Sequence, residues 1–412
     1  MLDDAICSLK VREIEEYDFK GKRVLVRCDF NVPVYQGIIS DKMRIYTAVQ
    51  TLQSVIGGGG YPIILSHFGS PKGNYNPKYS LKIVLDAVEQ ALGGKVSFSS
   101  SCLHNDIEEA MSRDSRGYAL LCENVRFHHG EEKNCNEFAK ELARSADLYI
   151  NEAFSVSHRK HASVVKLPSL LPSYAGFNFS REIKVLNGIL TNPEKPVVAV
   201  IGGAKISSKV SLLKKLVTSC DTVIIGGAMA NVFILAMGHS IGKSFCEVSM
   251  CAVAQEVLDL AKNNNCKILL PVDMIVTRST DKPDGAIIVQ VDSIPDDMMA
   301  VDIGSKTVDL FCTAISQAAT VLWNGPLGMY EIPPFHEGTS RVANAIIDVT
   351  VDSGAISVAG GGDTLSILSK IGVSSALTYV STGGGAFLQW LERGDAGMPG
   401  LVPLCDNSIP VS

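Results

Sequence analysis

The residues best able to do chemistry lie in turns that directly follow short apolar segments. In the second half of the chain these turns are glycines that leave the backbone bare, at Gly202-Gly203, Gly226-Gly227, Gly325, Gly360-Gly361-Gly362 and Gly383-Gly384-Gly385. Glycine lets a ligand approach the main chain, and consecutive N–H groups in such turns form concavities that bind anions. One turn alone is explained as well by a helix cap or a loop closure. Several of them predict a site for the phosphates of a nucleotide.

Two lysines follow the first glycine pair, in the sequence GGAKISSK. The apolar residues after them recur at helical spacing, at Val210, Leu213, Leu216 and Val217. This spacing predicts that Lys205 and Lys209 share one face of a helix near its N-terminus, where both ammonium groups can hold a phosphoryl group. A lysine pair by itself is more often a solvated face, but the preceding glycine turn favours the phosphate.

Asp363 follows the glycine triplet in the sequence GGGDT, at the expected start of a helix. Its carboxylate has two open roles, as a cap of the helix N-terminus or as a ligand of nucleotide-bound magnesium, and the two are compatible. Thr364, the next residue, has a hydroxyl that can donate to a phosphate, although a threonine in a first helical turn is commonly structural.

The first half of the chain presents side chains where the second half presents backbone. Arginines and a histidine lie in or after the turns, at Arg44, His67, Arg126 and Arg159. Together they suit the phosphate and carboxylate of a small acid, because arginine pairs bidentately with both groups. Each alone is more often a surface charge, or for His67 a structural residue. Asp29 and Asn31, in CDFN, either complement substrate hydroxyls or cap a turn.

These residues depend on repeated strand–helix units for their positions. Short runs rich in Val, Ile and Leu precede the turns, at residues 23–31, 61–70, 118–127 and 146–154 in the first half and 196–205, 221–230, 266–273, 320–328, 355–364 and 377–386 in the second. Helical periodicity follows the runs, which is typical of parallel sheets. We therefore predict an α/β fold with two Rossmann-like, three-layer α/β/α domains. Ligands then bind beyond the carboxyl ends of the strands.

The boundary between the domains is expected near residues 168–175, where PSLLPSYAG breaks the pattern before helical periodicity resumes at 180–190. We predict a first domain over 1–172, an interdomain helix with a hinge over 173–191, and a nucleotide domain over 192–393. The tail, residues 394–412, has no periodicity of its own and is expected to pack back on the first domain.

Bulk composition limits the possible partners. The chain has 412 residues, a net charge of -6 and a sequence pI near 5.8, which argues against nucleic acid or a membrane surface as partner. The acidic N-terminus does not resemble a signal peptide, and no apolar run approaches the length of a membrane span, so we expect a cytoplasmic protein. The 11 cysteines form no CxxC pair and are expected to be reduced thiols.

Two nucleotide motifs are excluded by their spacing. Residues 238–244, GHSIGKS, have three residues between the glycines where a Walker A loop has four, and no strand is expected before them. We predict a turn there. No GxGxxG sequence is present, so a dinucleotide site of the usual type has no support.

Taken together, these segments resemble phosphoglycerate kinases over nearly the whole chain. The resemblance is carried, in order, by RVLVRCDFNVP, DKMRI, SHFGSPKG, LLCENVRFHHGEEKN, NEAFSVSHRKHAS, VVAVIGGAKISSK, IIGGAMA, LLPVD, WNGPLGMYE, GGGDT and VSTGGGA. It implies a hinge-bending monomer that transfers a phosphoryl group between 1,3-bisphosphoglycerate and ADP, giving 3-phosphoglycerate and ATP, with Mg²⁺ bound to the nucleotide.

The resemblance also implies roles for individual residues. The triose acid would be bound by Asp29, Asn31, Arg44, His67, Arg126 and Arg159. The nucleotide would be bound by Gly202, Gly203, Lys205, Lys209, Gly226, Gly227, Pro326, Glu331, Gly361, Gly362, Asp363 and Thr364, with Glu331 at the ribose and Asp363 at the magnesium. The residues expected to act on the transferring group are Arg44, Lys205, Gly361 and Gly384.

The chain departs from the family pattern at several positions. Ser70 stands where the family has a substrate-side arginine, Glu152 replaces an aspartate, residues 155–157 read SVS where Gly-Thr-Ala is common, and Ser208 replaces an aspartate. The arginine missing at Ser70 predicts an active enzyme with weaker phosphoglycerate binding. The changes at Ser70 and at residues 155–157 also leave open a non-catalytic nucleotide-binding switch, while an ATP-dependent ligase would need a pocket for a second substrate that no motif suggests.

Overall fold

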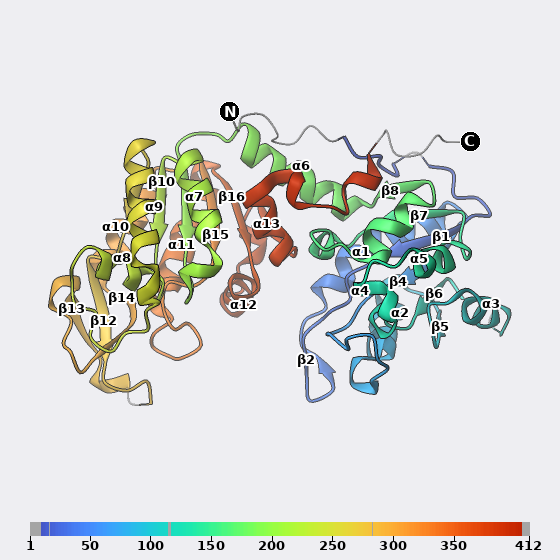
Figure 1. Ribbon diagram of the computed structural model, residues 1–412, viewed down its shortest axis with the longest axis horizontal. Coiled ribbons are helices and arrows are strands. Elements are labelled where there is room, and N and C mark those ends of the chain that lie inside the picture. The colour runs from blue at the N-terminus through green and yellow to red at the C-terminus, as the bar shows by residue number, and fades with distance from the viewer. Residues whose placement is uncertain (1–9, 16, 114–116, 282, 406–412) are drawn as a thin grey trace. The chain divides into compact units, whose positions relative to one another are not determined.

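The computed structural model describes residues 10–15, 17–113, 117–281 and 283–405. The chain divides into two compact units, each with its own sheet (Figure 1). The N-terminal unit comprises the chain up to Leu186 together with the segment from Arg393 onward, and the C-terminal unit comprises Asn187–Glu392. Predicted tail residues 406–412 lie outside the described residues.

The N-terminal unit contains a six-stranded sheet in the order β5-β6-β4-β1-β7-β8, with every pairing parallel. Its strands are β1 (Arg23–Arg27), β4 (Tyr61–Leu65), β5 (Val96–Ser99), β6 (Ala119–Cys122), β7 (Leu148–Asn151) and β8 (Ser173–Ala175). Its helices are α1 (Met43–Gly57), α2 (Leu85–Leu92), α3 (His104–Arg113), α4 (His129–Glu132), α5 (Asn136–Ala143) and α6 (Phe177–Thr191), the last of which continues into the C-terminal unit. The strands are buried on both faces, which explains their near-continuous apolar sequences.

The C-terminal unit contains a second six-stranded parallel sheet, in the order β11-β10-β9-β15-β16-β17. Its strands are β9 (Val197–Ile201), β10 (Thr222–Ile225), β11 (Lys267–Leu269), β15 (Thr320–Asn324), β16 (Ile356–Gly360) and β17 (Tyr379–Ser381). Its helices are α7 (Val210–Ser219), α8 (Ala230–Ala236), α9 (Cys251–Asn263), α10 (Ser305–Ile315), α11 (Glu337–Ser353), α12 (Gly362–Ile371) and α13 (Gly385–Arg393). Arg393, the last residue of α13, already belongs to the N-terminal unit.

The predicted α/β class is confirmed, and each of the ten predicted apolar runs contains a strand. The sequence did not reveal β5 and β8, the hairpin of β2 (Val34–Tyr35) and β3 (Ile38–Ile39), or the antiparallel sheet of β12 (Asp273–Thr277), β13 (Ile287–Gln290) and β14 (Met299–Ile303). The strands β2, β3, β5 and β8 have two to four residues each, and β13 is mostly exposed, so they lack a continuous apolar signature. β12 and β14 have five residues each, and an aspartate interrupts or borders the apolar run in both.

Three smaller predictions can be compared with the described residues. Residues 238–244 follow α8 and form turns without a preceding strand, as expected. The cysteines of the described residues are free thiols, and Cys7 lies outside that part of the chain. In the described tail, Gly400 N donates to the Ser157 carbonyl at 2.9 Å. No helix in the described ranges is long and apolar enough to cross a membrane.

Candidate functional site

The glycine turns of the C-terminal unit follow neighbouring parallel strands and pack against one another. A Cβ atom at Gly202, after β9, would lie 2.0 Å from the Pro326 carbonyl oxygen, after β15. One at Gly361, after β16, would lie 2.4 Å from Nδ2 of Asn324, and Gly361 has a φ of 104°. Glycine is therefore required here by the close approach of the turns to each other. Its presence is not by itself evidence of a ligand.

The prediction that Lys205 and Lys209 share one helical face is wrong. A 3-10 turn, Ile206–Ser208, lies between them, and α7 begins only at Val210. Lys205 is exposed, whereas the ammonium of Lys209 turns inward and donates to Gly202 O at 2.5 Å and to Asn324 Oδ1 at 2.6 Å. Burial lowers the pKa of Lys209 to about 8, and the nearby Asp363 carboxylate opposes this shift. The two lysines thus have different environments.

A cavity of about 480 Å³ opens beside the glycine turns, entirely within the C-terminal unit. Of the predicted nucleotide residues it brings together Gly203, Lys205, Gly227, Pro326, Glu331 and Asp363. Its apolar wall, which the sequence did not reveal, is built by Phe245, Met274, Met299, Val301, Leu327 and Met329. An apolar slot with charged groups at its rim suits a nucleotide, whose base is flat and whose phosphates are charged.

Other predicted residues, among them Gly361, Thr364 and Gly384, do not line this cavity but lie in or next to the turns around it. Gly361 is the N-cap of α12, so the expectation that Asp363 caps this helix is wrong, and Asp363 is an exposed residue of the first turn. The Thr364 side chain is fully buried, and its hydroxyl accepts from Gly325 N at 2.8 Å. Gly384 precedes α13 at the end of β17, the strand next to β16. The turn after β15 is therefore fastened to the helix that carries Asp363.

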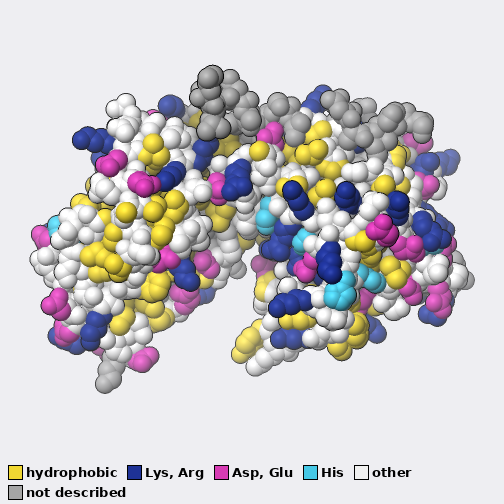
Figure 2. Space-filling view, viewed as in Figure 1, with side chains coloured by type: hydrophobic (Ala, Val, Ile, Leu, Met, Phe, Trp, Pro, Cys, Tyr) yellow, Lys and Arg dark blue, Asp and Glu magenta, His cyan; other side chains and the backbone are white. Residues whose placement is uncertain are grey.

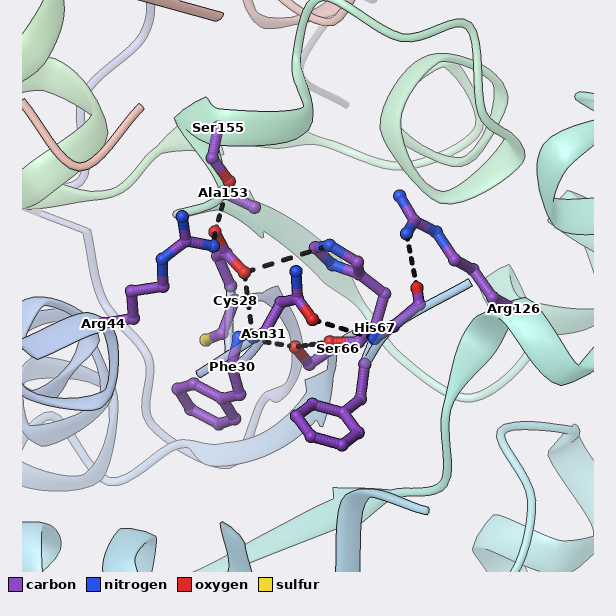
Figure 3. Close-up of polar contacts among 12 residues, drawn as sticks. Cys28, Phe30, Asn31, Arg44, Ser66, His67, Arg126, Ala153 and Ser155 are labelled. Atoms are coloured by element: carbon purple, nitrogen blue, oxygen red, sulfur yellow. Dashed lines mark hydrogen bonds and ion pairs between the residues drawn. The ribbon is translucent and has the colours of Figure 1, made fainter. Parts of the chain in front are cut away.

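In the N-terminal unit, Asn31, Arg44 and His67 lie close together (Figure 3), and each contacts the Asp29 carboxylate. Its Oδ2 accepts from Arg44 at 2.6 Å and from the Ser155 hydroxyl at 2.5 Å. Its Oδ1 accepts from Asn31 N at 3.0 Å and lies 4.0 Å from Nε2 of His67. Asp29 therefore orients an arginine and closes a turn at the same time.

A second part of this cluster is organised around Gly69. Its N–H donates to Oδ1 of Asn31 and its carbonyl accepts from Arg126, both at 2.8 Å. Burial, together with Arg27 and Arg159, lowers the pKa of Arg126 to about 10, which still leaves it charged at neutral pH. Arg159 is exposed. Figure 2 shows Lys, Arg and His side chains close together on this face of the unit.

His67 does not contribute the positive charge expected of a basic pocket. It is only 3% exposed, and burial lowers its pKa well below the ordinary value, with Arg27, Arg126, Arg44 and Arg159 adding to the shift. At neutral pH it is a neutral hydrogen-bonding group. The sequence analysis missed Arg27 and Ser155, although an arginine inside the apolar strand RVLVR was a visible signal.

Each of the two α/β units contains a parallel sheet. One unit has an apolar slot beside its glycine turns, and the other has clustered arginines. This combination suits the class of phosphotransferases that use a nucleotide and a small acid. A family model described as phosphoglycerate kinase matches residues 14–394. The chain is 43% identical over 393 residues to the phosphoglycerate kinase of Bartonella henselae, covering 95% of this chain and 98% of the relative. It is 45% identical over 385 residues to that of Methylorubrum populi, with 93% and 96% covered.

Solved structures of phosphoglycerate kinases also match this chain in fold. The phosphoglycerate kinase structure from Coxiella burnetii matches with a TM-score of 0.84 and 36% identity, covering 96% of this chain and 99% of that one. The structure from Pyrococcus horikoshii matches with a TM-score of 0.79 and 27% identity, covering 95% and 98%. The chain therefore belongs to the phosphoglycerate kinase family. It is a phosphotransferase of glycolysis with a carboxyl group as acceptor.

Proposed function

We propose that the enzyme transfers the phosphoryl group directly and in line between 1,3-bisphosphoglycerate and ADP, giving 3-phosphoglycerate and ATP. The proposal rests on how the charged side chains are distributed between the two units. Lys205 and Asp363 lie at the nucleotide-sized cavity of one unit, and Arg44 is oriented by Asp29 in the other. Because the donors belong to different units, the proposal requires a hinge-like closure of the units on the bound substrates.

We assign the acid to the cluster around Asp29 and Gly69. Arg44, Arg126 and Arg159 supply the positive charge for its phosphate and carboxylate, since guanidinium groups pair with both. Asp29 and Asn31 face its hydroxyl, and neutral His67 adds a directional hydrogen bond rather than charge. Ser70, exposed beside Gly69, adds no charge, whereas the family pattern that the sequence resembles has an arginine at this position.

The nucleotide is assigned to the cavity of the C-terminal unit. Its base lies against the apolar wall, and Glu331 at the rim accepts from the ribose hydroxyls. The phosphates extend to Lys205 and to the main chain of the glycine turns, including Gly361, Gly362 and Gly384. Gly362 and Gly385 are the first residues of α12 and α13, and amides at helix N-termini favour anions. Lys209, partly buried behind the turn, adds a second positive charge.

The residues at the cavity fit a magnesium ion that arrives with the nucleotide. No three metal-binding side chains converge within the described part of the chain, so the protein offers no complete metal cage there. Asp363 is exposed and lines the cavity, and Mg²⁺ is commonly held by one or two carboxylates and the phosphates of its substrate. When bound, the ion would neutralise charge on those phosphates.

The chemistry needs no covalent intermediate. A carboxylate of 3-phosphoglycerate attacks the γ-phosphoryl group, and in the other direction the acyl phosphate delivers it to ADP. Arg44 and Lys205 neutralise charge on the transferring group, together with the amides of Gly361 and Gly384. Fixed donors of this kind typically contribute about 3 kcal/mol each to lowering a barrier. Enclosure of the site keeps water away from the phosphoryl group.

Replacing Lys205 tests this assignment in a coupled assay with 3-phosphoglycerate and MgATP. We expect Lys205→Ala to lower kcat by about 10²- to 10³-fold while ADP still binds, because the loss is a transition-state contact. Lys214→Ala removes a partly exposed lysine of α7 that pairs with Glu256 of α9, and this matched control should keep its activity. A folded wild-type protein without turnover would favour the nucleotide-binding switch instead.

We also infer that the enzyme acts as a monomer in the cytoplasm. Sedimentation at micromolar concentration tests the first point, and fractionation of the source cells tests the second.

A further inference from the structure

A fully buried arginine lies behind the substrate cluster. Arg27, the last residue of β1, has 0% exposure, so it cannot touch a substrate. Its guanidinium donates in three directions: Nε to Ser163 Oγ at 2.9 Å, one terminal nitrogen to Cys28 O at 2.5 Å, and the other to Nδ1 of His67 at 3.3 Å. A buried charge with this many directed contacts fixes the groups around it.

Ser163 connects this arginine to a buried carboxylate. It lies in the π-helical segment Ala162–Lys166 and has 0% exposure. Its hydroxyl donates to Oε1 of Glu131 at 2.6 Å, and its N–H donates to Oε2 at 2.9 Å. A hydroxyl has one proton, so if it donates to Glu131 it must accept from Arg27. Glu131, also 0% exposed, therefore balances the charge of Arg27 through a single hydroxyl.

The contact between Arg27 and His67 decides which imidazole nitrogen carries the proton. Arginine can only donate, so Nδ1 of His67 must be the acceptor and is unprotonated. A neutral imidazole then carries its proton on Nε2. Nε2 is the nitrogen that lies 4.0 Å from Oδ1 of Asp29. The N–H is thus directed toward the substrate cluster, and burial among arginines, which lowers the pKa of His67, keeps the ring neutral.

We propose that Glu131, Ser163 and Arg27 are positioning residues of the reaction, which hold His67 as the Nε2–H tautomer and direct that N–H toward the acid substrate. None of the three touches the substrate. The effect on substrate binding rests on the proposed assignment of His67 to the acid site, whereas the tautomer itself does not depend on that assignment.

The first test measures the tautomer in the wild-type protein. Nitrogen NMR of ¹⁵N-histidine-labelled enzyme at pH 7, without substrate, distinguishes protonated from unprotonated ring nitrogens. The His67 signals are assigned by their loss in a His67→Gln variant. We expect an unprotonated Nδ1 and a protonated Nε2. A protonated Nδ1, or a ring protonated on both nitrogens, would overturn the proposal.

The second test removes the connecting hydroxyl. We expect Ser163→Ala to raise the KM for 3-phosphoglycerate about tenfold, with kcat within about threefold, because a binding contact becomes misdirected. The NMR spectrum should then show both tautomers of His67. Ser163→Thr keeps the hydroxyl and should restore the wild-type KM and spectrum. Ser163→Cys keeps nearly the same shape with a weak hydrogen-bonding group, and it gives the same readouts if the alanine variant does not fold.

Ser145→Ala is the matched control for loss of a buried hydroxyl. Ser145 is 1% exposed and its hydroxyl contacts His104 rather than this network. The Ser145→Ala variant should change the stability of the protein without changing the KM for 3-phosphoglycerate or the His67 spectrum. If Ser163→Ala behaves in the same way as Ser145→Ala, its hydroxyl is only structural and the proposal is wrong. A failed turnover assay alongside an Nε2–H tautomer would count against the assigned role of His67, not against the network.

Discussion

The hydroxyl of Ser155 lies 2.5 Å from Oδ2 of Asp29, the same carboxylate oxygen that accepts from Arg44. The family pattern that the sequence resembles commonly has glycine at this position, so we expect the contact to be particular to this chain. It ties the loop that carries Arg159 to the carboxylate that orients Arg44.

Replacing Ser155 should therefore weaken binding of the acid. We expect Ser155→Ala to raise the KM for 3-phosphoglycerate about threefold to tenfold, which corresponds to the roughly 1 kcal/mol that a typical hydrogen bond contributes. Ser155 is only partly buried, so the free energy of unfolding should change little. Steady-state kinetics measure the effect, and Ser155→Thr, which keeps the hydroxyl, is the control. A lower KM would mean that the hydroxyl competes with the substrate for Asp29.

Ser70 offers a change in the opposite direction. It is exposed and follows Gly69, whose amide and carbonyl contact Asn31 and Arg126. We expect Ser70→Arg to lower the KM for 3-phosphoglycerate about threefold to tenfold, because it adds a donor for the substrate anion. Ser112→Arg, on the exposed side of α3, adds the same charge elsewhere and should leave the KM unchanged. An unchanged KM for Ser70→Arg would contradict the prediction.

Lys209 predicts a pH dependence of nucleotide binding. Burial lowers its pKa to about 8, so in the free enzyme it loses its charge as the pH rises through that value. Nucleotide phosphates favour the charged form, so binding of ADP above pH 8 should take up a proton. We expect the Kd of ADP to be about tenfold higher at pH 9 than at pH 7.

Calorimetry in buffers of different ionisation enthalpy measures this proton uptake directly. Lys209→Arg keeps a charge at every accessible pH and should bind ADP without the dependence. The same pH dependence in that variant would assign it to another group.

Glu152 predicts a pH dependence of stability. It accepts from Thr51 Oγ1 at 2.5 Å and from the amides of Asn178 and Phe179, at the start of α6, at 3.1 and 2.9 Å. Burial raises its pKa from 4.5 to about 7, although these hydrogen bonds oppose the shift. Between these two pH values the folded protein therefore keeps a proton on Glu152 that the unfolded chain releases. The stability associated with it is fully present below pH 4.5 and lost as the pH rises through 7.

Glu152→Gln cannot ionise and should escape this loss. Relative to this variant, the wild-type free energy of unfolding should fall by up to about 3 kcal/mol between pH 4.5 and pH 8. Urea unfolding over this range measures the difference. Glu109→Gln, at an exposed glutamate of α3, is the control and should show almost no such change. A constant difference between wild type and Glu152→Gln would contradict the prediction.

The α/β class and the ten predicted strands follow from the sequence alone, because apolar runs followed by turns are local patterns, and the family follows from the segments that resemble it. The sequence also singled out Lys205, Asp363 and the acid-binding candidates, because most of them follow an apolar run, although Arg44 lies in the first turn of α1. It could not determine that Lys205 and Lys209 face different surroundings, because that depends on a 3-10 turn between them and on Asn324, 115 residues further along the chain. The apolar wall of the cavity comes from β12, β14 and two loops, and no local signal connects them. In the same way, Arg27, His67, Ser163 and Glu131 are far apart in the chain, and only packing in the tertiary structure decides which imidazole nitrogen carries the proton.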